Sequence, residues 1–370
     1  MGHSHDKKFT PLHDLLFQEI ENRESASLSF AEFMDICLYH EDLGYYADPT
    51  ARKIGRSGDF FTSVSVGDTF GLLLARDIRR NFGDGERFAI VEQGAHDGQL
   101  ALDIMVALDD LGVENLEGYF IVEPREKIRA NLGKKIESTG YVRRINPVGS
   151  FAEVGPFDTG IFLANELLDA IPVHRVIFEE GNWKELRVTV NRGGFAWLPS
   201  AIESGSRLEF ETNRFGTNFP EGYTTEVCLA LESWASGLLG LFRERGVFRV
   251  IDYGLEEADY LAPHRTSGTL QCYRNHRKSE NPFELPGETD LTAHVNFSHL
   301  QRAAESAGFR NFRLTDQHHF LVHAAEDWLR EIDGQPPDSA GAKRLRQFQT
   351  LIHPTMMGRS FQVAEFEKIG

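Results

Sequence analysis

Apolar residues recur along the chain with two spacings, and each spacing predicts a different kind of element. Short, nearly continuous apolar runs alternate with stretches in which apolar residues return every three or four positions. The first pattern is typical of strands buried on both faces, and the second of amphipathic helices. The predicted strands are "RFAIVEQG" (87–94), "GYFIVEP" (118–124), "FDTGIFLA" (157–164) and "GVFRVIDYG" (246–254). Their alternation with helices predicts a parallel sheet covered on both faces.

Helical spacing fills the stretches before and between these strands. The predicted helices are two within 12–40, "FGLLLARDIRRNFG" (70–83), "GQLALDIMVALDDLG" (98–112) and the polar "REKIRANLGKKIEST" (125–139). The pattern changes in residues 174–222, where alternating residues and Gly turns predict antiparallel hairpins inserted between sheet elements. The polar stretches 44–63 and 273–294 predict loops, the second long enough to be functional or disordered.

These patterns predict one elaborated α/β domain over residues 1–370, since the sequence shows no internal repeat, low-complexity tract or obvious linker. Its predicted parts are a helical N-terminal part at about 10–85, a core sheet at about 86–172 and 224–370, and the hairpin insertion at about 174–222.

Composition narrows the range of partners. The formal net charge of −17 argues against a nucleic acid. The three cysteines stand far apart without CxxC or Cys/His spacing, so we expect neither a disulfide framework nor a metal site. No apolar run approaches the roughly 18 residues of a membrane helix. The N-terminus lacks an apolar signal core and is too acidic for a mitochondrial transit peptide, so we expect a cytoplasmic protein without membrane insertion.

A glycine-containing turn follows the first predicted strand. In "VEQGAHDGQLALDIM" (91–105), Gly94 and Gly98 bracket a turn in which the backbone can approach a nucleotide closely. Glu92 lies near the end of this strand, and Glu123 ends the next strand, where an acid can accept hydrogen bonds from ribose hydroxyls. A purely structural turn is the alternative interpretation of this loop.

Two cofactor classes use this layout. A dinucleotide needs G-x-G-x-x-G, whereas this loop reads G-A-H-D-G-Q, and Glu92 and Asp97 would repel a pyrophosphate. S-adenosylmethionine has no phosphate and carries a sulfonium and an ammonium group, so acids near the turn are acceptable. The loop therefore favours a methyl donor.

A second polar cluster, in "LANELLDAIPVHR" (163–175), follows the third predicted strand. It places Asn165, Glu166 and Asp169 where the carboxyl ends of sheet strands meet, the usual ligand crevice of such sheets. Because Glu166 and Asp169 are three residues apart, both carboxylates could face one side of a helical turn. A capped helix start with solvated acids is the alternative.

Several segments together resemble the MidA-like family of class I S-adenosylmethionine-dependent methyltransferases, which includes a mitochondrial arginine methyltransferase. The most specific are "ANELLDAIPV" and "PGETDLTAHVNF", and "HEDLGYYADP", "VEQGAHDGQLALDI" and "FRVIDYG" add to them. The resemblance runs in family order from about residue 30 to residue 368. It implies a class I (Rossmann-like) methyltransferase sheet with an N-terminal helical extension and the inserted hairpin region.

The resemblance also implies roles for residues. Gly94 and Gly98 hold the loop under the methionine part of the cofactor, Glu123 binds its ribose, and Asn165 with Glu166 stands by the transferred methyl group. The cofactor-binding candidates are Glu92, Gly94, Ala95, His96, Gly98, Gln99, Glu123, Pro124 and Asn165. The candidates for a substrate site or lid are Tyr45, Tyr46, Phe60, Thr62, Ser63 and His174.

Three residues depart from the family pattern. His96 stands where the family has a glycine, Asp97 where it has an arginine, and Ser65 where it has a glutamate. The first two departures bear on cofactor affinity, and the third bears on helix capping or substrate chemistry.

Methyl transfer requires an aligned nucleophile and the exclusion of water. For an arginine acceptor, whose free pKa lies above ~12, carboxylates would orient the guanidinium and accept its proton. The candidates for this role are Glu166, Asp169 and Asp59. His174 could act as a base for another acceptor, although a lone histidine entering a strand is more often structural.

We therefore predict an S-adenosylmethionine-dependent enzyme that methylates a protein side chain, of the arginine type. Two alternatives stay open: a non-catalytic assembly or binding protein, which His96 and Ser65 favour, and a small-molecule methyltransferase. A dehydrogenase ranks last because the G-x-G-x-x-G pattern is broken. The family resemblance admits a homodimer, but no residue pattern points to one.

Overall fold

The computed structural model describes residues 10–47, 62–83, 85–274, 277–334 and 338–370. Its contacts divide the chain into two compact units, each built from three separate segments. Unit 1 comprises Met1–Ala51, Ala170–Ala230 and Glu256–His294, and unit 2 comprises Arg52–Asp169, Leu231–Leu255 and Val295–Gly370. Each unit has a hydrophobic core of its own. The single elaborated domain over residues 1–370 stays a prediction.

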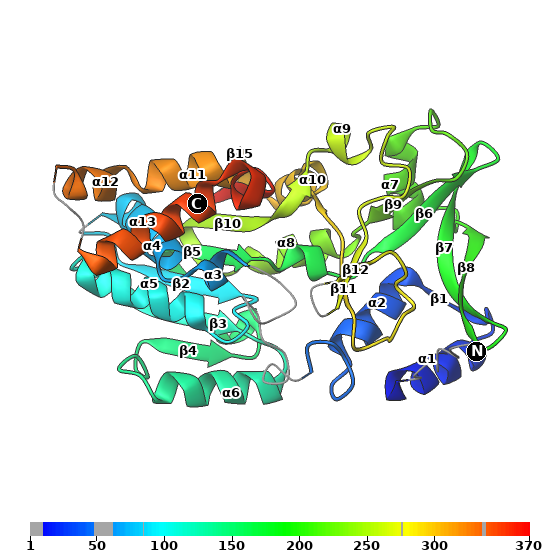
Figure 1. Cartoon of the computed structure of the whole chain (residues 1–370), viewed down its shortest axis with the longest axis horizontal. Coiled ribbons are helices and arrows are strands. Elements are labelled where there is room, and N and C mark those ends of the chain that lie inside the picture. The colour runs from blue at the N-terminus through cyan, green and yellow to red at the C-terminus, as the bar shows by residue number, and fades with distance from the viewer. Residues whose placement is uncertain (1–9, 48–61, 84, 275–276, 335–337) are drawn as a thin grey trace, which may run out of the picture. The chain divides into compact units, whose positions relative to one another are not determined.

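Unit 2 contains the predicted α/β sheet (Figure 1). Its strand order is β15-β16-β10-β5-β2-β3-β4, with the short β14 beside β10. The parallel strands are β2 (Phe88–Gln93), β3 (Leu116–Val122), β4 (Ile145–Val148), β5 (Phe157–Asn165), β10 (Phe242–Leu255) and β14 (Val295–Asn296). β15 (Arg310–Asp316) and β16 (Phe361–Ile369) run antiparallel to their neighbours. The α/β class is confirmed, but the sheet is mixed and not wholly parallel.

Helices cover both faces of this sheet. The helices of unit 2 are α3 (Ser63–Val66), α4 (Thr69–Phe82), α5 (Gln99–Asp110), α6 (Glu126–Glu137), α8 (Ala230–Leu238), α10 (Phe297–Ala307), α11 (Gln317–Ala324), α12 (Glu326–Ile332) and α13 (Ser339–Ile352), with short turns of other helical types at Phe151–Glu153, Leu168–Ala170 and Pro354–Gly358. The helices predicted over 70–83, 98–112 and 125–139 are therefore confirmed.

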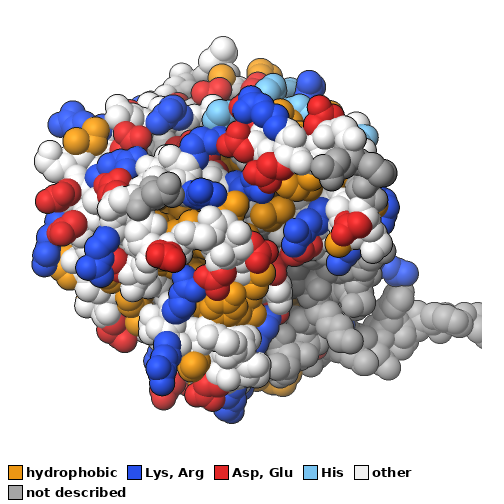
Figure 2. Space-filling view, turned by 90° about the vertical axis from the view of Figure 1, so that its left-hand side faces the viewer, with side chains coloured by type: hydrophobic (Ala, Val, Ile, Leu, Met, Phe, Trp, Pro, Cys, Tyr) orange, Lys and Arg blue, Asp and Glu red, His pale blue; other side chains and the backbone are white. Residues whose placement is uncertain are grey.

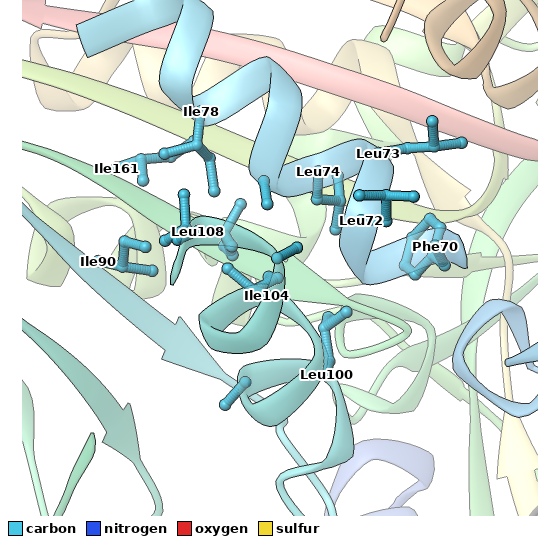
Figure 3. Packing of buried hydrophobic residues seen from close by; sticks show 14 of the residues in the cluster. Phe70, Leu72, Leu73, Leu74, Ile78, Ile90, Leu100, Ile104, Leu108 and Ile161 are labelled. Carbon is cyan, nitrogen blue, oxygen red and sulfur yellow. The ribbon is translucent and has the colours of Figure 1, made fainter. Parts of the chain in front are cut away.

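The packing of α4 and α5 against the sheet follows from their apolar spacing. Leu74 and Ile78 of α4 pack in one buried cluster with Ile104 and Leu108 of α5 and Ile90 of β2 (Figure 3). All five side chains are at most 1% exposed, and each such burial stabilises the fold by about 1.5–3 kcal/mol. This packing fixes the strand ends that carry the candidate site.

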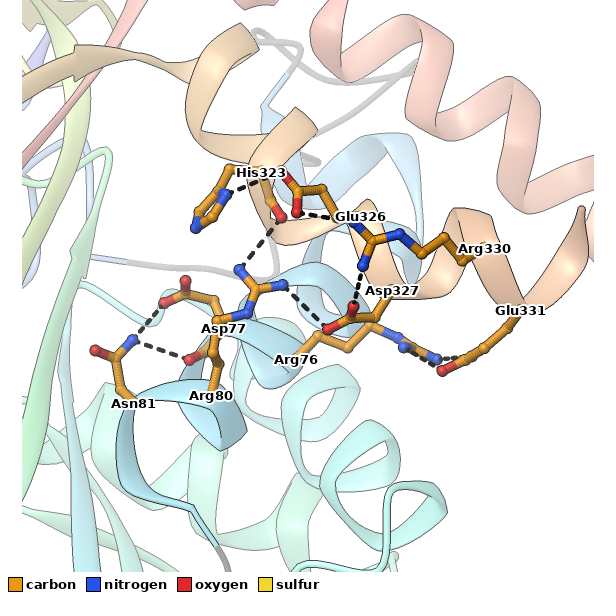
Figure 4. Close-up of polar contacts among 9 residues, drawn as sticks. All are labelled: Arg76, Asp77, Arg80, Asn81, His323, Glu326, Asp327, Arg330 and Glu331. Atoms are coloured by element: carbon orange, nitrogen blue, oxygen red, sulfur yellow. Dashed lines mark hydrogen bonds and ion pairs between the residues drawn. The ribbon is translucent and has the colours of Figure 1, made fainter.

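Two kinds of ion pair surround α4. Arg249 of β10 is fully buried, with Nη2 2.5 Å from Asp77 Oδ2 and 2.6 Å from Glu365 Oε1. Arginines of α4 itself pair with α12 near the surface, including Arg76 with Glu331 (Figure 4). Such exposed pairs each contribute at most about 1 kcal/mol. Acidic and basic side chains are interspersed over the face drawn in Figure 2.

Unit 1 contains the predicted hairpins. Its main sheet has the order β1-β7-β6-β9, with β8 beside β7, and every pair in it is antiparallel. The strands are β1 (Ser27–Ser29), β6 (His174–Glu179), β7 (Asn182–Asn191), β8 (Gly194–Ala201) and β9 (Tyr223–Val227). The helices are α1 (Pro11–Glu21), α2 (Phe30–Tyr39), α7 (Arg207–Phe215) and α9 (Glu257–Tyr260). The hairpins and the two N-terminal helices are therefore confirmed.

Two segments differ from their predictions. The predicted loop 273–294 contains strands of a small sheet, formed by β11 (Gln271–Arg274), β12 (Arg277–Ser279) and β13 (Asp290–Thr292). These strands have three or four residues, too few for an alternating pattern to stand out. β9 lies at the start of the segment 224–370 assigned to the core sheet, yet it pairs with β6. Of the predicted loop 44–63, residues 48–61 lie outside the described part of the chain.

No helix in the described ranges has the length and apolarity needed to cross a membrane.

Candidate active site

The carboxyl ends of four neighbouring strands of unit 2 carry most of the candidate residues. β10, β5, β2 and β3 are adjacent and parallel, so these ends meet at one edge of the sheet. The glycine turn follows β2, Glu123 follows β3, and Asn165 ends β5. This edge is the place where open α/β sheets bind ligands.

The turn after β2 has three residues in the left-handed region: Gly94 at φ 84°, His96 at φ 50° and Gly98 at φ 75°. Ala95 is buried between them and accepts a hydrogen bond from the Gly98 N–H at 2.7 Å. A Cβ at position 94 would lie 3.1 Å from the Leu167 side chain, so the turn after β2 touches the turn after β5. The two motifs found separately in the sequence therefore lie side by side.

The two unusual residues of this loop interact with each other and with α6. Asp97 accepts hydrogen bonds from the Gln99 N–H at 3.1 Å and from Lys135 Nζ at 2.9 Å. Nδ1 of His96 lies 3.8 Å from Asp97 Oδ1. Although burial acts to raise it, hydrogen bonds from His96 and Lys135 hold the pKa of Asp97 well below its usual range. The charge of Asp97 is thus balanced by cationic or donor groups.

The two acids at the ends of β2 and β3 have different surroundings. Glu92 is buried, and the Tyr119 hydroxyl donates to its Oε2 at 2.7 Å. Burial raises the pKa of Glu92 to about 7. Glu123 is also buried, but Arg125 donates to both of its carboxylate oxygens at 2.8 Å. Pro124, which lies between Glu123 and Arg125, is exposed. Glu123 is therefore held in place at the strand end by Arg125.

The turn after β5 places Asn165 and Glu166 together. Glu166 has φ 51°, and its N–H donates to Ile251 O of β10 at 2.9 Å. Its Oε1 accepts hydrogen bonds from the Ser63 N–H at 3.2 Å and from Asn165 Nδ2 at 3.1 Å. Burial, followed by the charge of Asp252, raises the pKa of Glu166 to about 8. The buried Oδ1 of Asn165 has no hydrogen-bond partner among the described residues.

The predicted geometry of Glu166 and Asp169 is wrong in one respect. The helical turn is a short 3-10 segment, Leu168–Ala170, and Glu166 precedes it in a left-handed conformation. The two acids do not share one helical turn, because the 3-10 segment begins at Leu168, after Glu166. The Asp169 N–H donates to Asp252 Oδ2 at 3.3 Å.

Asp252 is a site residue that the sequence analysis missed. It lies in β10, is fully buried, and directly contacts the Asn165–Asp169 turn. "FRVIDYG" was identified as a strand, and an acid within an apolar strand was the available signal. The sequence could not show that this strand lies beside β5.

The segment before α4 supplies a third part of the site. Thr62 and Ser65 form a capping box, in which each side-chain oxygen accepts from the other residue's N–H, at 3.0 and 3.1 Å. Ser65 therefore serves the capping role that a glutamate could fill. Ser63 Oγ donates to Gln317 Oε1 at 3.1 Å. The candidates Asp59 and Phe60 lie outside the described residues.

The remaining candidates belong to unit 1. Nδ1 of His174 lies 2.8 Å from Glu185 Oε1, a hydrogen bond between β6 and β7 that supports a structural role. Tyr45 is buried, and the Tyr46 ring stacks on Tyr39 with 5.6 Å between centroids. The Tyr46 hydroxyl donates to Asp290 at 3.1 Å.

The mixed sheet, the glycine turn after β2 and the acids after β3 and β5 define a class I methyltransferase. A family model described as "Putative S-adenosyl-L-methionine-dependent methyltransferase" matches residues 73–315. The chain belongs to this family, and the predicted MidA-like resemblance is confirmed.

Relatives extend this assignment over most of the chain. The mitochondrial protein arginine methyltransferase NDUFAF7 of Danio rerio is 26% identical over 90% of this chain and 82% of its own length. Its human counterpart is 24% identical, over 95% of this chain and 82% of its own length. A crystal structure from Burkholderia thailandensis bound to S-adenosyl-homocysteine is 30% identical, with a TM-score of 0.85, covering 96% of this chain and 92% of that one.

The residues present fit S-adenosylmethionine, the cofactor of this family. Carboxylates gather at the edge of the sheet with the buried Asn165 Oδ1, an amide oxygen that has no hydrogen-bond partner in the described part of the chain. Lys135, the cation that reaches the glycine turn from α6, is bound to Asp97. The carboxylate and amide oxygens at this edge suit a ligand with sulfonium, ammonium and ribose hydroxyl groups. Glu123 would bind the ribose, and the Gly94–Gly98 turn would lie against the methionine part.

Proposed function

We propose that this S-adenosylmethionine-dependent methyltransferase methylates arginine side chains of a protein. The observation that carries the proposal is the Asn165–Glu166 pair at the end of β5: Asn165 Nδ2 donates to Glu166 Oε1, and the buried Asn165 Oδ1 has no partner among the described residues. The names of the relatives support the same acceptor. The net charge of −17 is compatible with a cationic segment as substrate.

The groups at this edge suit an acceptor nitrogen that carries hydrogens. The Asn165 Oδ1 and the Glu166 carboxylate can both accept hydrogen bonds from an acceptor nitrogen, and a guanidinium offers five N–H donors. S-adenosylmethionine supplies an electrophilic methyl group. The chain would orient the guanidinium nitrogen toward that group through Asn165 and Glu166.

Proton balance gives Glu166 a second role. A guanidinium nitrogen that gains a methyl group must lose one proton, and Glu166, which directly follows β5, would accept it. Because its pKa is raised to about 8, Glu166 is a stronger base than an exposed glutamate once it is ionised. The C–S bond breaks as the N–C bond forms, the electron pair of the C–S bond stays on sulfur, and the proton passes to the carboxylate.

The two features that favoured a non-catalytic protein have structural accounts of their own. His96 lies beside Asp97, and Ser65 completes a capping box with Thr62. The small-molecule alternative remains an outcome of the test.

The test is transfer of a deuterated methyl group from S-adenosylmethionine by the purified full chain to an extract of its source cells lacking this protein. Mass spectrometry of hydrolysed protein should reveal labelled methylarginine, and Glu166→Gln should remove it. Label in lysine or in small molecules alone, or no label while S-adenosylhomocysteine binds by calorimetry, would contradict the arginine assignment.

Two further expectations stay predictions. We propose a cytoplasmic location, although the relatives are named as mitochondrial proteins. Imaging of the tagged chain in its source cells tests it. A homodimer is likewise a proposal, which sedimentation would test.

A further inference from the structure

One buried carboxylate receives all the backbone donors that follow Glu166 in the turn. Oδ2 of Asp252 accepts hydrogen bonds from the N–H groups of Leu167 at 3.1 Å, Leu168 at 2.7 Å and Asp169 at 3.3 Å. Its Oδ1 accepts from the Tyr253 N–H at 2.8 Å. Asp252 is 0% exposed. Its carboxyl group therefore holds the turn through a nest of backbone N–H groups.

Without the Asp252 carboxylate, the N–H groups of residues 167–169 would lose the hydrogen-bond acceptor that they share. β5 ends at Asn165, so residues 167–169 lie beyond its ladder with β10. Unsatisfied buried N–H groups are costly, at about 1–3 kcal/mol each. Glu166 precedes them at φ 51°, a conformation that a non-glycine residue adopts only when its surroundings hold it there.

Asp252 is placed to act through Glu166. Four backbone N–H groups occupy its two oxygens, whereas Glu166 Oε1 is held by Ser63 and Asn165. The charge of Asp252 also acts on Glu166, whose pKa it raises beyond the effect of burial. A change at Asp252 should thus alter both the direction and the ionisation of Glu166.

We propose that Asp252 is the positioning residue of the methyl-transfer site: its buried carboxylate fixes the 166–169 turn and thereby directs Asn165 and Glu166 at the acceptor nitrogen. This rests on the proposed function for the identity of the acceptor alone. The arrangement of the turn does not depend on which nitrogen is methylated.

The test compares Asp252→Asn with wild type in the full chain. Asparagine keeps the volume but loses the charge and presents N–H groups toward backbone donors. Methyl transfer to cell-extract protein should fall by about 100-fold, the scale of a displaced reacting group. Carbon-13 NMR of labelled glutamate carboxyls, with Glu166→Gln to assign the signal, should show Glu166 titrating at lower pH in Asp252→Asn.

A matched control is Asp158→Asn, the same change at an exposed aspartate near the start of β5. It should leave the transfer rate and the Glu166 titration unchanged. A folded Asp252→Asn protein with wild-type transfer and an unmoved Glu166 titration would overturn the proposal. The NMR measurement needs no methyl acceptor. A failed search for methylarginine therefore counts against the proposed function, whereas the NMR result still tests the role of Asp252.

The wild type provides a measurement that is independent of variant folding. Amide hydrogens of residues 167–169 should exchange as slowly as those of β5. Exchange at the rate of an exposed loop would contradict the carboxylate anchor, because the three N–H groups would then lack their partner.

Discussion

The turns after β2 and β5 reach the same unusual backbone conformation by different means. Each contains a non-glycine residue in the left-handed region, His96 at φ 50° and Glu166 at φ 51°. His96 stands between two glycines of positive φ, Gly94 and Gly98. Glu166 has no glycine neighbour, and its turn is held by hydrogen bonds from 166–169 to β10.

This difference separates local from distant control of a site. A left-handed non-glycine residue costs about 1–3 kcal/mol, which the surroundings must offset. In the first turn the offset lies in nearby, partly exposed groups such as Asp97 and Lys135. In the second it lies in a fully buried acid of another strand. Substitutions should therefore have small effects in the first turn, except at Gly94, and large effects in the second.

The largest effect should come from Glu166→Gln. Removing a general base lowers the rate by about 10²–10⁴-fold, while S-adenosylhomocysteine affinity by calorimetry should be unchanged. In the wild type, transfer should rise with pH through about 8, because Glu166 must lose its proton. Wild-type activity in Glu166→Gln would remove this residue from the chemistry.

The same substitution makes a stability prediction. The folded-state pKa of Glu166 is raised above the value of ~4.3 in an unfolded chain. Its contribution to stability is therefore complete below pH ~4 and is lost as the pH rises through about 8. The free energy of unfolding, measured with a chemical denaturant, should fall between pH 5 and pH 9. This fall should be smaller in Glu166→Gln than in wild type.

Gly94→Ala should have the next largest effect, because Gly94 lies where the two turns are in contact. The added Cβ would meet Leu167 at 3.1 Å in a backbone at φ 84°. We expect a loss of about 1–3 kcal/mol in unfolding free energy and weaker S-adenosylhomocysteine binding. Gly155→Ala, where a Cβ meets nothing within 4 Å, is the matched control and should lose neither. Equal behaviour of the two variants would show that the turns are not in contact.

Lys135→Met tests the ion pair of the first turn. Asp97 has a lowered pKa, so its contribution to stability is present above the unfolded pKa of ~3.9 and is lost as the pH falls below it. The pair is partly exposed, so the loss at pH 7 should be at most about 1 kcal/mol and should shrink toward pH 2. Lys134→Met, at the exposed neighbouring residue of α6, serves as the control. If Lys135→Met lowered the free energy of unfolding equally at pH 7 and at pH 2, a charge effect would be excluded.

His96→Gly should have the smallest effect on stability. Glycine relieves the left-handed strain but loses more entropy on folding, so the gain should stay below about 1 kcal/mol. Arg192→Gly, at φ 49° in the exposed β7–β8 turn, is the matched control for backbone effects. A change in S-adenosylhomocysteine affinity in His96→Gly alone would place the imidazole against the cofactor.

The sequence was informative where a structural signal is local. Apolar runs identified the strands of unit 2, and i,i+3/i+4 spacing identified α4, α5 and α6. The glycine turn and the Asn165–Glu166 cluster were recognised because each directly follows a strand. Their adjacency at one edge followed from the expected parallel sheet.

The features that the sequence did not reveal depend on strand neighbours. Asp252 is 84 residues from Leu168, and only the parallel pairing of β5 with β10 brings them together. The sequence around Glu166 contains no glycine that would indicate its left-handed conformation. The short strands of 271–292 have too few residues for a period to show.

The alternation of segments between the two units has a consequence for synthesis. Unit 2 draws on segments that begin at Arg52, Leu231 and Val295. β16, the strand from Phe361 to Ile369, pairs with β10 along nine residues of register. During translation, β10 therefore gains this neighbour only after residues 361–369 have left the ribosome. Until then an apolar strand edge stays open, so the nascent chain should depend on chaperones while it emerges.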